Sequence, residues 1–146
     1  GLIRIVDRKK EIIINSNGKN MSPAHIESVL KSAGSLIGNV IVVGNGRPYN
    51  VALLLLDAEG CSVLRELNQR SHRSNLDEAL RDAVRQQLDR ANENLSAVER
   101  IRRWTILSED WVPGGDELTV TMKLRRRNIE TKYREQIEEL YTEHGG

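Results

Sequence analysis

The sequence contains very few aromatic residues: they make up 3% of its 146 residues, and phenylalanine is absent. A chain of this length suits one compact domain, so its core must be built mainly from aliphatic side chains. Cys61 is the single cysteine, which excludes an internal disulfide and favours a reducing compartment. The composition therefore predicts one domain that depends on neither disulfides nor aromatic packing.

Long apolar runs are also missing. The longest, residues 36–43 and 51–56, have the length of strands, well short of the roughly 20 residues that a membrane-spanning helix requires. The chain opens on Gly1-Leu2-Ile3 without the basic leader of a signal peptide. We therefore expect a cytoplasmic protein, and peripheral attachment to a membrane stays open.

Charge of one sign is not in excess, because 22 basic and 21 acidic side chains give a net charge of +1. This balance gives no support for a dedicated nucleic-acid-binding protein. The histidines His25, His72 and His144 are far apart, and no cysteine or carboxylate lies at ligand spacing from them. We expect no bound metal in this chain.

The first half of the chain alternates strand and helix patterns. Two β-branched stretches, Leu2–Val6 and Glu11–Ile14, predict short strands around a charged turn. Asn17-Gly18 predicts a second turn, and Ser22-Pro23 is typical of a helix start. An apolar stripe at helical spacing follows and ends at Gly34; it consists of Ile26, Val29, Leu30 and Ala33. Residues 36–43 and 51–56 predict an antiparallel hairpin, with Gly44-x-Gly46 as its turn.

The second half begins with a short helix, which we expect from Asp57 to about Leu67, and a polar connector over residues 69–75. Ser74 and Asp77 then resemble a capping box for the longest helix. Its apolar face comprises Leu76, Ala79, Leu80, Ala83, Val84, Leu88, Ala91 and Leu95. Residues 102–107 predict a strand, and residues 108–117 a loop. The sum is an α+β domain with a small, largely antiparallel sheet packed with helices.

One lysine near the C-terminus stands in an unusual context. Lys123 follows hydroxyl and apolar residues and precedes three arginines, in the pattern T-x-T-M-K-L-R-R-R over residues 119–127. The helical pattern that follows, with Ile129, Tyr133, Ile137, Leu140 and Tyr141, places Lys123 on a loop just before a helix. A flexible ammonium there can reach an anion that a partner supplies. Taken alone, however, Lys123 is one more solvated cation beside an arginine cluster.

The N-terminal stretch changes that interpretation. It has the order I-V-D-R-K-K-E-I-I over residues 5–13, then G-K-N-M-S-P over 18–23, then I-E at 26–27. This order resembles the hinge and following loop of AMP-forming acyl-CoA synthetases. Together with the motif around Lys123 it resembles the long-chain fatty acid branch of the adenylate-forming superfamily. The resemblance spans nearly the whole chain and is sharp at residues 3–30 and 118–134.

The resemblance implies a mobile C-terminal domain, residues 1–146, of a fatty acid–CoA ligase that uses ATP with Mg²⁺ and CoA. A large N-terminal domain, absent from this chain, would hold most of the substrate sites, so we expect the chain alone to be inactive. Lys123, on a loop of about residues 108–124, matches the catalytic lysine. Asp7 and Lys10 match the hinge, at about residues 7–11, and Arg8 and Lys10 match residues near the nucleotide. Gly18, Lys19 and Asn20 match the loop along the CoA tunnel, with an ordinary turn as the alternative.

One departure from the family pattern concerns Ile14, which stands where many relatives have a lysine. It leaves the details of thioester formation open, though not the adenylation role of Lys123. Two alternatives remain for the whole chain. The first is a fatty acyl-AMP ligase or another carboxylic acid–CoA ligase. The second is a non-enzymatic module that binds nucleic acid or acidic membrane through residues 125–134 and the longest helix.

Overall fold

A three-stranded sheet forms the centre of the protein in a computed structural model, which describes residues 11–58, 62, 76–107, 111–121 and 123–142. Its strands are β3 (Ile37–Val43), β4 (Asn50–Leu56) and β5 (Ile101–Ile106), in the order β3-β4-β5. The β3–β4 pair is antiparallel, as predicted from the turn at Gly44-x-Gly46. The β4–β5 pair is parallel, so the prediction of a largely antiparallel sheet holds only for the other pairs.

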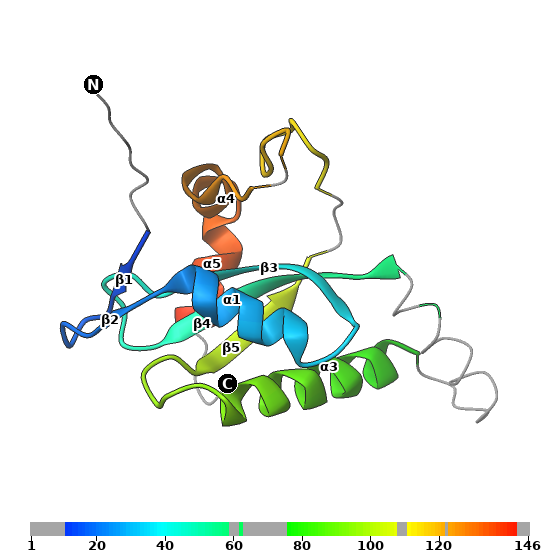
Figure 1. Cartoon of the computed structure of the whole chain (residues 1–146), viewed down its shortest axis with the longest axis horizontal. Coiled ribbons are helices and arrows are strands. Elements are labelled where there is room, and N and C mark those ends of the chain that lie inside the picture. The colour runs from blue at the N-terminus through cyan, green and yellow to red at the C-terminus, as the bar shows by residue number, and fades with distance from the viewer. Residues whose placement is uncertain (1–10, 59–61, 63–75, 108–110, 122, 143–146) are drawn as a thin grey trace, which may run out of the picture.

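The parallel pair follows from the long connection between its strands. The helix α3 (Leu76–Glu93) lies between β4 and β5 in the chain and packs on the sheet, as the green helix in Figure 1 shows. A crossover of this length brings the chain back to the end of the sheet where β4 began, so β5 runs beside β4 in the same direction. The helix and the strand predicted in this part of the chain are confirmed as α3 and β5, and the crossover makes β5 parallel to β4.

Both faces of the sheet are covered, which explains why β4 is apolar along nearly its whole length. On one face α1 (Pro23–Ser32) and α3 pack against alternate strand residues, among them Val40, Val42 and Leu54. On the other face α4 (Arg126–Lys132) and α5 (Arg134–Thr142) pack against Ile41, Val51 and Leu53. Figure 1 shows the two helix pairs on either side of the strands. The domain is thus a helix–sheet–helix sandwich with two cores. The first is mainly aliphatic, but the second also contains the aromatic pair Trp111 and Tyr133, so the expectation of a core without aromatic packing is wrong there.

The hairpin before α1 is built around one buried asparagine. β1 (Ile13–Ile14) pairs antiparallel with β2 (Asn20–Met21), and Gly18 has φ 81° in the turn between them. The Asn15 side chain accepts hydrogen bonds from the backbone N–H groups of Asn17 and Lys19, each at 2.9 Å. The turn predicted at Asn17-Gly18 is confirmed, and Asn15 supplies its internal partner.

Helix α1 begins as predicted, with Ser22 accepting a hydrogen bond from the N–H of His25 at 3.1 Å. Its end has a different cause from the one predicted. Gly34 does not have positive φ; instead, a Cβ there would lie 2.6 Å from the Gln87 side-chain oxygen. Gln87 of α3 donates to the Leu30 carbonyl at 2.9 Å and accepts from the Leu36 N–H at 3.1 Å. A side chain from the other helix therefore completes this end of α1.

The helical pattern at the C-terminus divides into two helices. α4 ends at Lys132 and α5 starts at Arg134, because Tyr133 leaves the helical conformation with φ −106° and ψ 26°. The Tyr133 ring is buried, and its hydroxyl accepts a hydrogen bond from the Trp111 indole at 3.1 Å. The loop before Lys123 is thereby fastened to the break between the helices.

Several predictions lie outside the described residues. They are the strand at Leu2–Val6, the connector at 69–75, Cys61, and most of the short helix after Asp57, of which Ala58 and Ser62 are described as helical.

We expect Gln87→Leu to lower the free energy of unfolding by about 2–4 kcal/mol, because it leaves the Leu30 carbonyl and the Leu36 N–H without their partner. Gln86→Leu is the matched control: Gln86 is exposed on the same helix turn and should change stability by no more than about 0.5 kcal/mol. Urea unfolding of the chain measures both. Equal unfolding midpoints for the two variants would contradict the assigned role of Gln87.

Candidate active site

Lys123 lies on a small hairpin that projects from the sandwich. Leu118 and Leu124 form an antiparallel bridge across it. The Thr119 N–H donates to the Lys123 carbonyl at 2.9 Å, and the Lys123 N–H donates to the Thr119 hydroxyl at 3.0 Å. The Lys123 side chain is exposed. The loop before a helix that the sequence predicts is confirmed, and it holds the ammonium toward solvent from a fixed backbone.

The base of this hairpin is anchored in the second core. Leu118 is fully buried, and the Glu117 carbonyl accepts a hydrogen bond from the Arg125 N–H at 2.8 Å. The buried Glu117 carboxylate forms an ion pair with Lys132 of α4. These contacts hold both arms of the hairpin against α4, so its base cannot move without disturbing the core.

A pocket of about 460 Å³ connects Lys123 with the N-terminal segment. Its lining includes Glu11, Ser22, Pro23, Ala24, Lys123, Leu124 and Arg126. Glu11 is the last residue of the predicted hinge, and Ser22–Ala24 form the start of α1. The structure therefore places the lysine next to residues that the sequence separates from it by about a hundred positions.

Arg126 lies at the centre of this arrangement. Its guanidinium binds both carboxylate oxygens of Glu27, at 2.6 and 2.5 Å, and also forms an ion pair with Glu11. Glu27 is buried and accepts a further hydrogen bond from the Val42 N–H at 2.9 Å. Burial by itself would lower the pKa of Arg126, but Glu27 and Glu11 raise it above its ordinary value. Arg126 therefore stays cationic and joins α4 to α1, to the end of the predicted hinge and, through Glu27, to β3.

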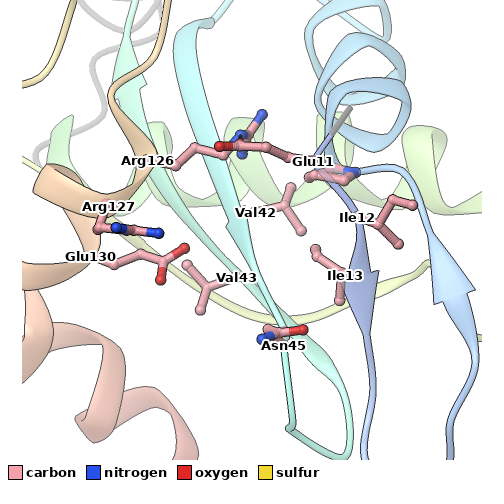
Figure 2. A pocket seen from close by; sticks show the side chains of 11 residues that line it. Glu11, Ile12, Ile13, Val42, Val43, Asn45, Arg126, Arg127 and Glu130 are labelled. Atoms are coloured by element: carbon pink, nitrogen blue, oxygen red, sulfur yellow. Dashed lines mark ion pairs between the residues drawn. The ribbon is translucent and has the colours of Figure 1, made fainter. Parts of the chain in front are cut away.

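A second pocket of about 310 Å³ lies beside this network (Figure 2). Arg127 and Glu130 stand on one side of it and Ile12 and Ile13 on the other, with Val43 between them. Burial raises the pKa of Glu130, although the charge of Arg126 opposes that effect. The pocket is thus lined by both charge signs and by apolar side chains.

The arginines that follow Lys123 do not act as one basic surface. Arg126 is neutralised by two carboxylates, and the Arg125 Nε contacts the Leu118 carbonyl at 3.4 Å. Arg127 and Arg134 line a pocket together with Glu130 and Glu138. This interspersed charge weakens the case for a module that binds nucleic acid or acidic membrane.

The residues predicted to line the CoA tunnel occupy a different edge. Gly18, Lys19 and Asn20 are exposed in and after the β1–β2 turn, and a Cβ on Gly18 would meet no atom within 4 Å. The neighbouring Ser16 N–H donates to the Arg47 carbonyl at 2.9 Å. In Figure 1 this turn lies at the left edge of the molecule, away from the hairpin before α4. The structure does not bring Lys123 and these residues together.

Asp7, Arg8 and Lys10 lie outside the described residues. Ile14 is 48% exposed on β1 and so presents an apolar side chain to solvent. Within the described residues, no three histidine, cysteine or carboxylate side chains are grouped so that they could hold a metal ion. No helix in the same part of the chain is both long and apolar enough to cross a membrane.

Comparison with known families identifies the domain. The model of the AMP-binding enzyme C-terminal domain matches residues 10–145, and the chain belongs to this family. A Mycobacterium tuberculosis protein named as the fatty-acid–CoA ligase fadD11 is 45% identical over 144 residues, covering 97% of this chain and 25% of that protein. Long-chain-fatty-acid–CoA ligase FadD15 of the same species is 33% identical, over 97% of this chain and 24% of that protein. The chain thus spans about a quarter of the length of the curated relatives it matches.

Solved structures share the fold at lower sequence identity. The adenylation domain of a carboxylate reductase from Mycobacterium chelonae superposes with a TM-score of 0.73 at 20% identity, over 90% of this chain and 19% of that one. A Mycobacterium tuberculosis fatty acyl CoA synthetase gives a TM-score of 0.54 at 19% identity, over 89% of this chain and 21% of that one. The predicted fold class is confirmed.

Sequence reasoning did not find the supporting residues Glu27, Arg126 and Thr119. The position of Glu27 beside the stripe residue Ile26 was a usable indication, because a carboxylate next to a buried helix face needs a cationic partner. Its partner, Arg126, is 99 residues away and is one of three consecutive arginines. Nothing in the sequence distinguishes it from its neighbours.

We expect Glu27→Gln to lower the free energy of unfolding by about 3 kcal/mol, because it leaves the mostly buried Arg126 charge without its main partner. Glutamine still accepts the Val42 N–H, so the substitution tests the charge. Asp82→Asn is the control, since Asp82 and Arg85 form a pair whose side chains are 54% and 62% exposed and should contribute less than about 0.5 kcal/mol. Denaturant unfolding measures both, and a Glu27→Gln loss as small as that of the control would refute the assignment.

Proposed function

We propose that this chain is the C-terminal catalytic domain of a ligase that activates a long-chain fatty acid with ATP and transfers it to CoA. The names of the relatives at 45% and 33% identity support the substrate class. The observation that carries the proposal is the exposed Lys123 on a hairpin whose backbone is fixed at both ends. A cation presented in this way suits a phosphate that another part of the enzyme binds.

Lys123 acts in the first half-reaction. The fatty acid carboxylate attacks the α-phosphorus of ATP, the bond to the leaving pyrophosphate breaks, and acyl-adenylate forms. Negative charge gathers on the phosphate oxygens while an anionic nucleophile approaches. At ~4 Å and an effective dielectric of ~20, an ammonium–oxyanion contact contributes roughly 4 kcal/mol before desolvation. Mg²⁺ bound with ATP would neutralise further phosphate charge.

The second half-reaction uses another edge of the domain. The CoA thiol attacks the acyl carbon and AMP leaves, with Gly18, Lys19 and Asn20 beside the pantetheine arm. The separation of these residues from Lys123 supports a domain that turns between the two steps. In this proposal the chain pivots near Asp7 and Lys10, and Arg8 and Lys10 contact the nucleotide held by a larger N-terminal domain. A charged turn can change its dihedral angles without exposing core.

A second candidate function is a fatty acyl-AMP ligase, which would pass the acyl group to an acceptor other than CoA. The resemblance supports it: Ile14, which is 48% exposed, matches a position where the family pattern has a lysine that would assist thioester formation. Dependence of product formation on CoA separates the two candidates. Both retain the same role for Lys123.

In the intact enzyme we expect Lys123→Ala to slow acyl-adenylate formation by ~10²–10³-fold, because the transition state loses a positioned cation. Thioester formation from supplied acyl-adenylate should change little. Lys31→Ala is the matched control, since Lys31 is exposed in the last turn of α1 and should leave both rates unchanged. Pyrophosphate release and acyl-CoA formation, measured separately, report the two steps. An equal loss in both steps would show that the division of labour is wrong.

We expect Lys19→Ala to have the opposite pattern: adenylation unchanged, and the KM for CoA raised by roughly 3–10-fold through loss of an exposed cation near the phosphates of CoA. The effect should diminish at high ionic strength. Steady-state assays at varied CoA and salt concentrations measure it. If the KM for CoA were unchanged in Lys19→Ala, residues 18–20 would be an ordinary turn without a role in CoA binding.

A further inference from the structure

The described residues at the tip of the hairpin that carries Lys123 are exposed. Val120 is 78% exposed at this tip, and Thr121 is also exposed. Leu118 on the first arm is fully buried, and it pairs with the half-buried Leu124 on the second arm. Lys123 is itself exposed, so among the described residues its backbone is held by hydrogen bonds.

Thr119 supplies those bonds from both its backbone and its side chain. Its N–H donates to the Lys123 carbonyl at 2.9 Å, which continues the ladder that starts at the Leu118–Leu124 bridge. Its hydroxyl oxygen accepts the Lys123 N–H at 3.0 Å. The same oxygen lies 3.1 Å from the Thr121 hydroxyl. Lys123 is thus held on both sides of its Cα by a single residue.

A threonine suits this position for two reasons. A hydroxyl has two acceptor lone pairs and one donor, so Thr119 can accept the Lys123 N–H while also bonding to Thr121. The β-branched side chain has few rotamers, which keeps its oxygen directed at the loop with little loss of entropy. A residue without the hydroxyl would leave the Lys123 N–H to solvent and the tip free to change its conformation.

We propose that Thr119 is a positioning residue for adenylation, which orients the Lys123 ammonium by fixing the Lys123 backbone through its hydroxyl. The inference rests on the proposed function of Lys123 and adds a residue that acts through it. Thr119 itself contacts no substrate in this role. Since a displacement of about 1 Å can reduce a rate ~10²-fold, loss of this hydroxyl should reduce the rate and leave substrate binding nearly unaltered.

The test uses the intact enzyme with Thr119→Val and Thr119→Ser, measured beside Lys123→Ala. Valine keeps the β-branched shape and removes the acceptor, whereas serine keeps the acceptor. We expect Thr119→Val to lower the kcat of adenylation by about 10–100-fold with the KM for ATP changed less than about 3-fold. Thr119→Ser should recover most of the rate, and thioester formation from supplied acyl-adenylate should be unchanged. Thr131→Val, on the exposed surface of α4, is the control and should match the unsubstituted enzyme.

Three results would overturn the inference. Adenylation by Thr119→Val at the normal rate, while Lys123→Ala is impaired, would show that the hydroxyl does not position the lysine. Equal losses of adenylation rate in Thr119→Val and Thr119→Ser would show that the hydroxyl is not responsible. Equal losses in both half-reactions of Thr119→Val would show general damage to the domain. If Thr119→Val does not fold, Thr119→Ala takes its place, and its rates of adenylation and thioester formation are compared in the same way. Full adenylation by Lys123→Ala would instead remove the proposed function, and this inference with it.

Discussion

The contact between Arg126 and Glu27 is the constraint on which the candidate active face depends. Two opposite charges withdrawn from water are tolerated only when good geometry compensates their desolvation. Here both carboxylate oxygens of Glu27 bind the guanidinium, and one of them also accepts the Val42 N–H. The start of α4, three residues after Lys123, is therefore held against α1 and β3. Glu11 binds the same arginine, so the lysine hairpin and the end of the predicted hinge share one point of attachment.

The sheet explains why this attachment is rigid. Because both of its faces are buried, α1 and the α4–α5 pair are fixed on opposite sides of the same strands. Leu118 belongs to the second core, as do Trp111 and Tyr133, which are hydrogen-bonded to each other. The hairpin of Lys123 thus stands on packed residues at its base, while hydrogen bonds from Thr119 hold its tip. Rigidity at the base and exposure at the tip are what a cation needs when its target belongs to another domain.

Apolar runs and patterns of period 3.6 were sufficient to predict β3, β4, α1 and α3, whose apolar side chains fill the cores. The strand β5 was predicted as well, although only Ile101 on it is buried. They did not predict the break at Tyr133, because the apolar spacing runs through it; the hydroxyl of this residue is held by a hydrogen bond from Trp111, 22 residues earlier. They also could not separate Arg126 from its neighbours. Burial of a charge depends on a partner brought by the fold, and that information is absent from local sequence. Lys123 was identified only through a motif, since its exposure and its spacing are those of an ordinary surface lysine.

The position of the two candidate regions limits how the domain can work. Lys123 and the Gly18 turn lie at different edges of one sandwich, and rearrangement within the sandwich would separate Arg126 from Glu27 and open a core. Such a change costs several kcal/mol, whereas rotation about backbone dihedrals in a short polar segment costs little. If both regions serve one nucleotide site in turn, the domain must move as a unit. The predicted hinge at about residues 7–11 fits this requirement, and Glu11, its last residue, is the first described residue that the ion-pair network holds.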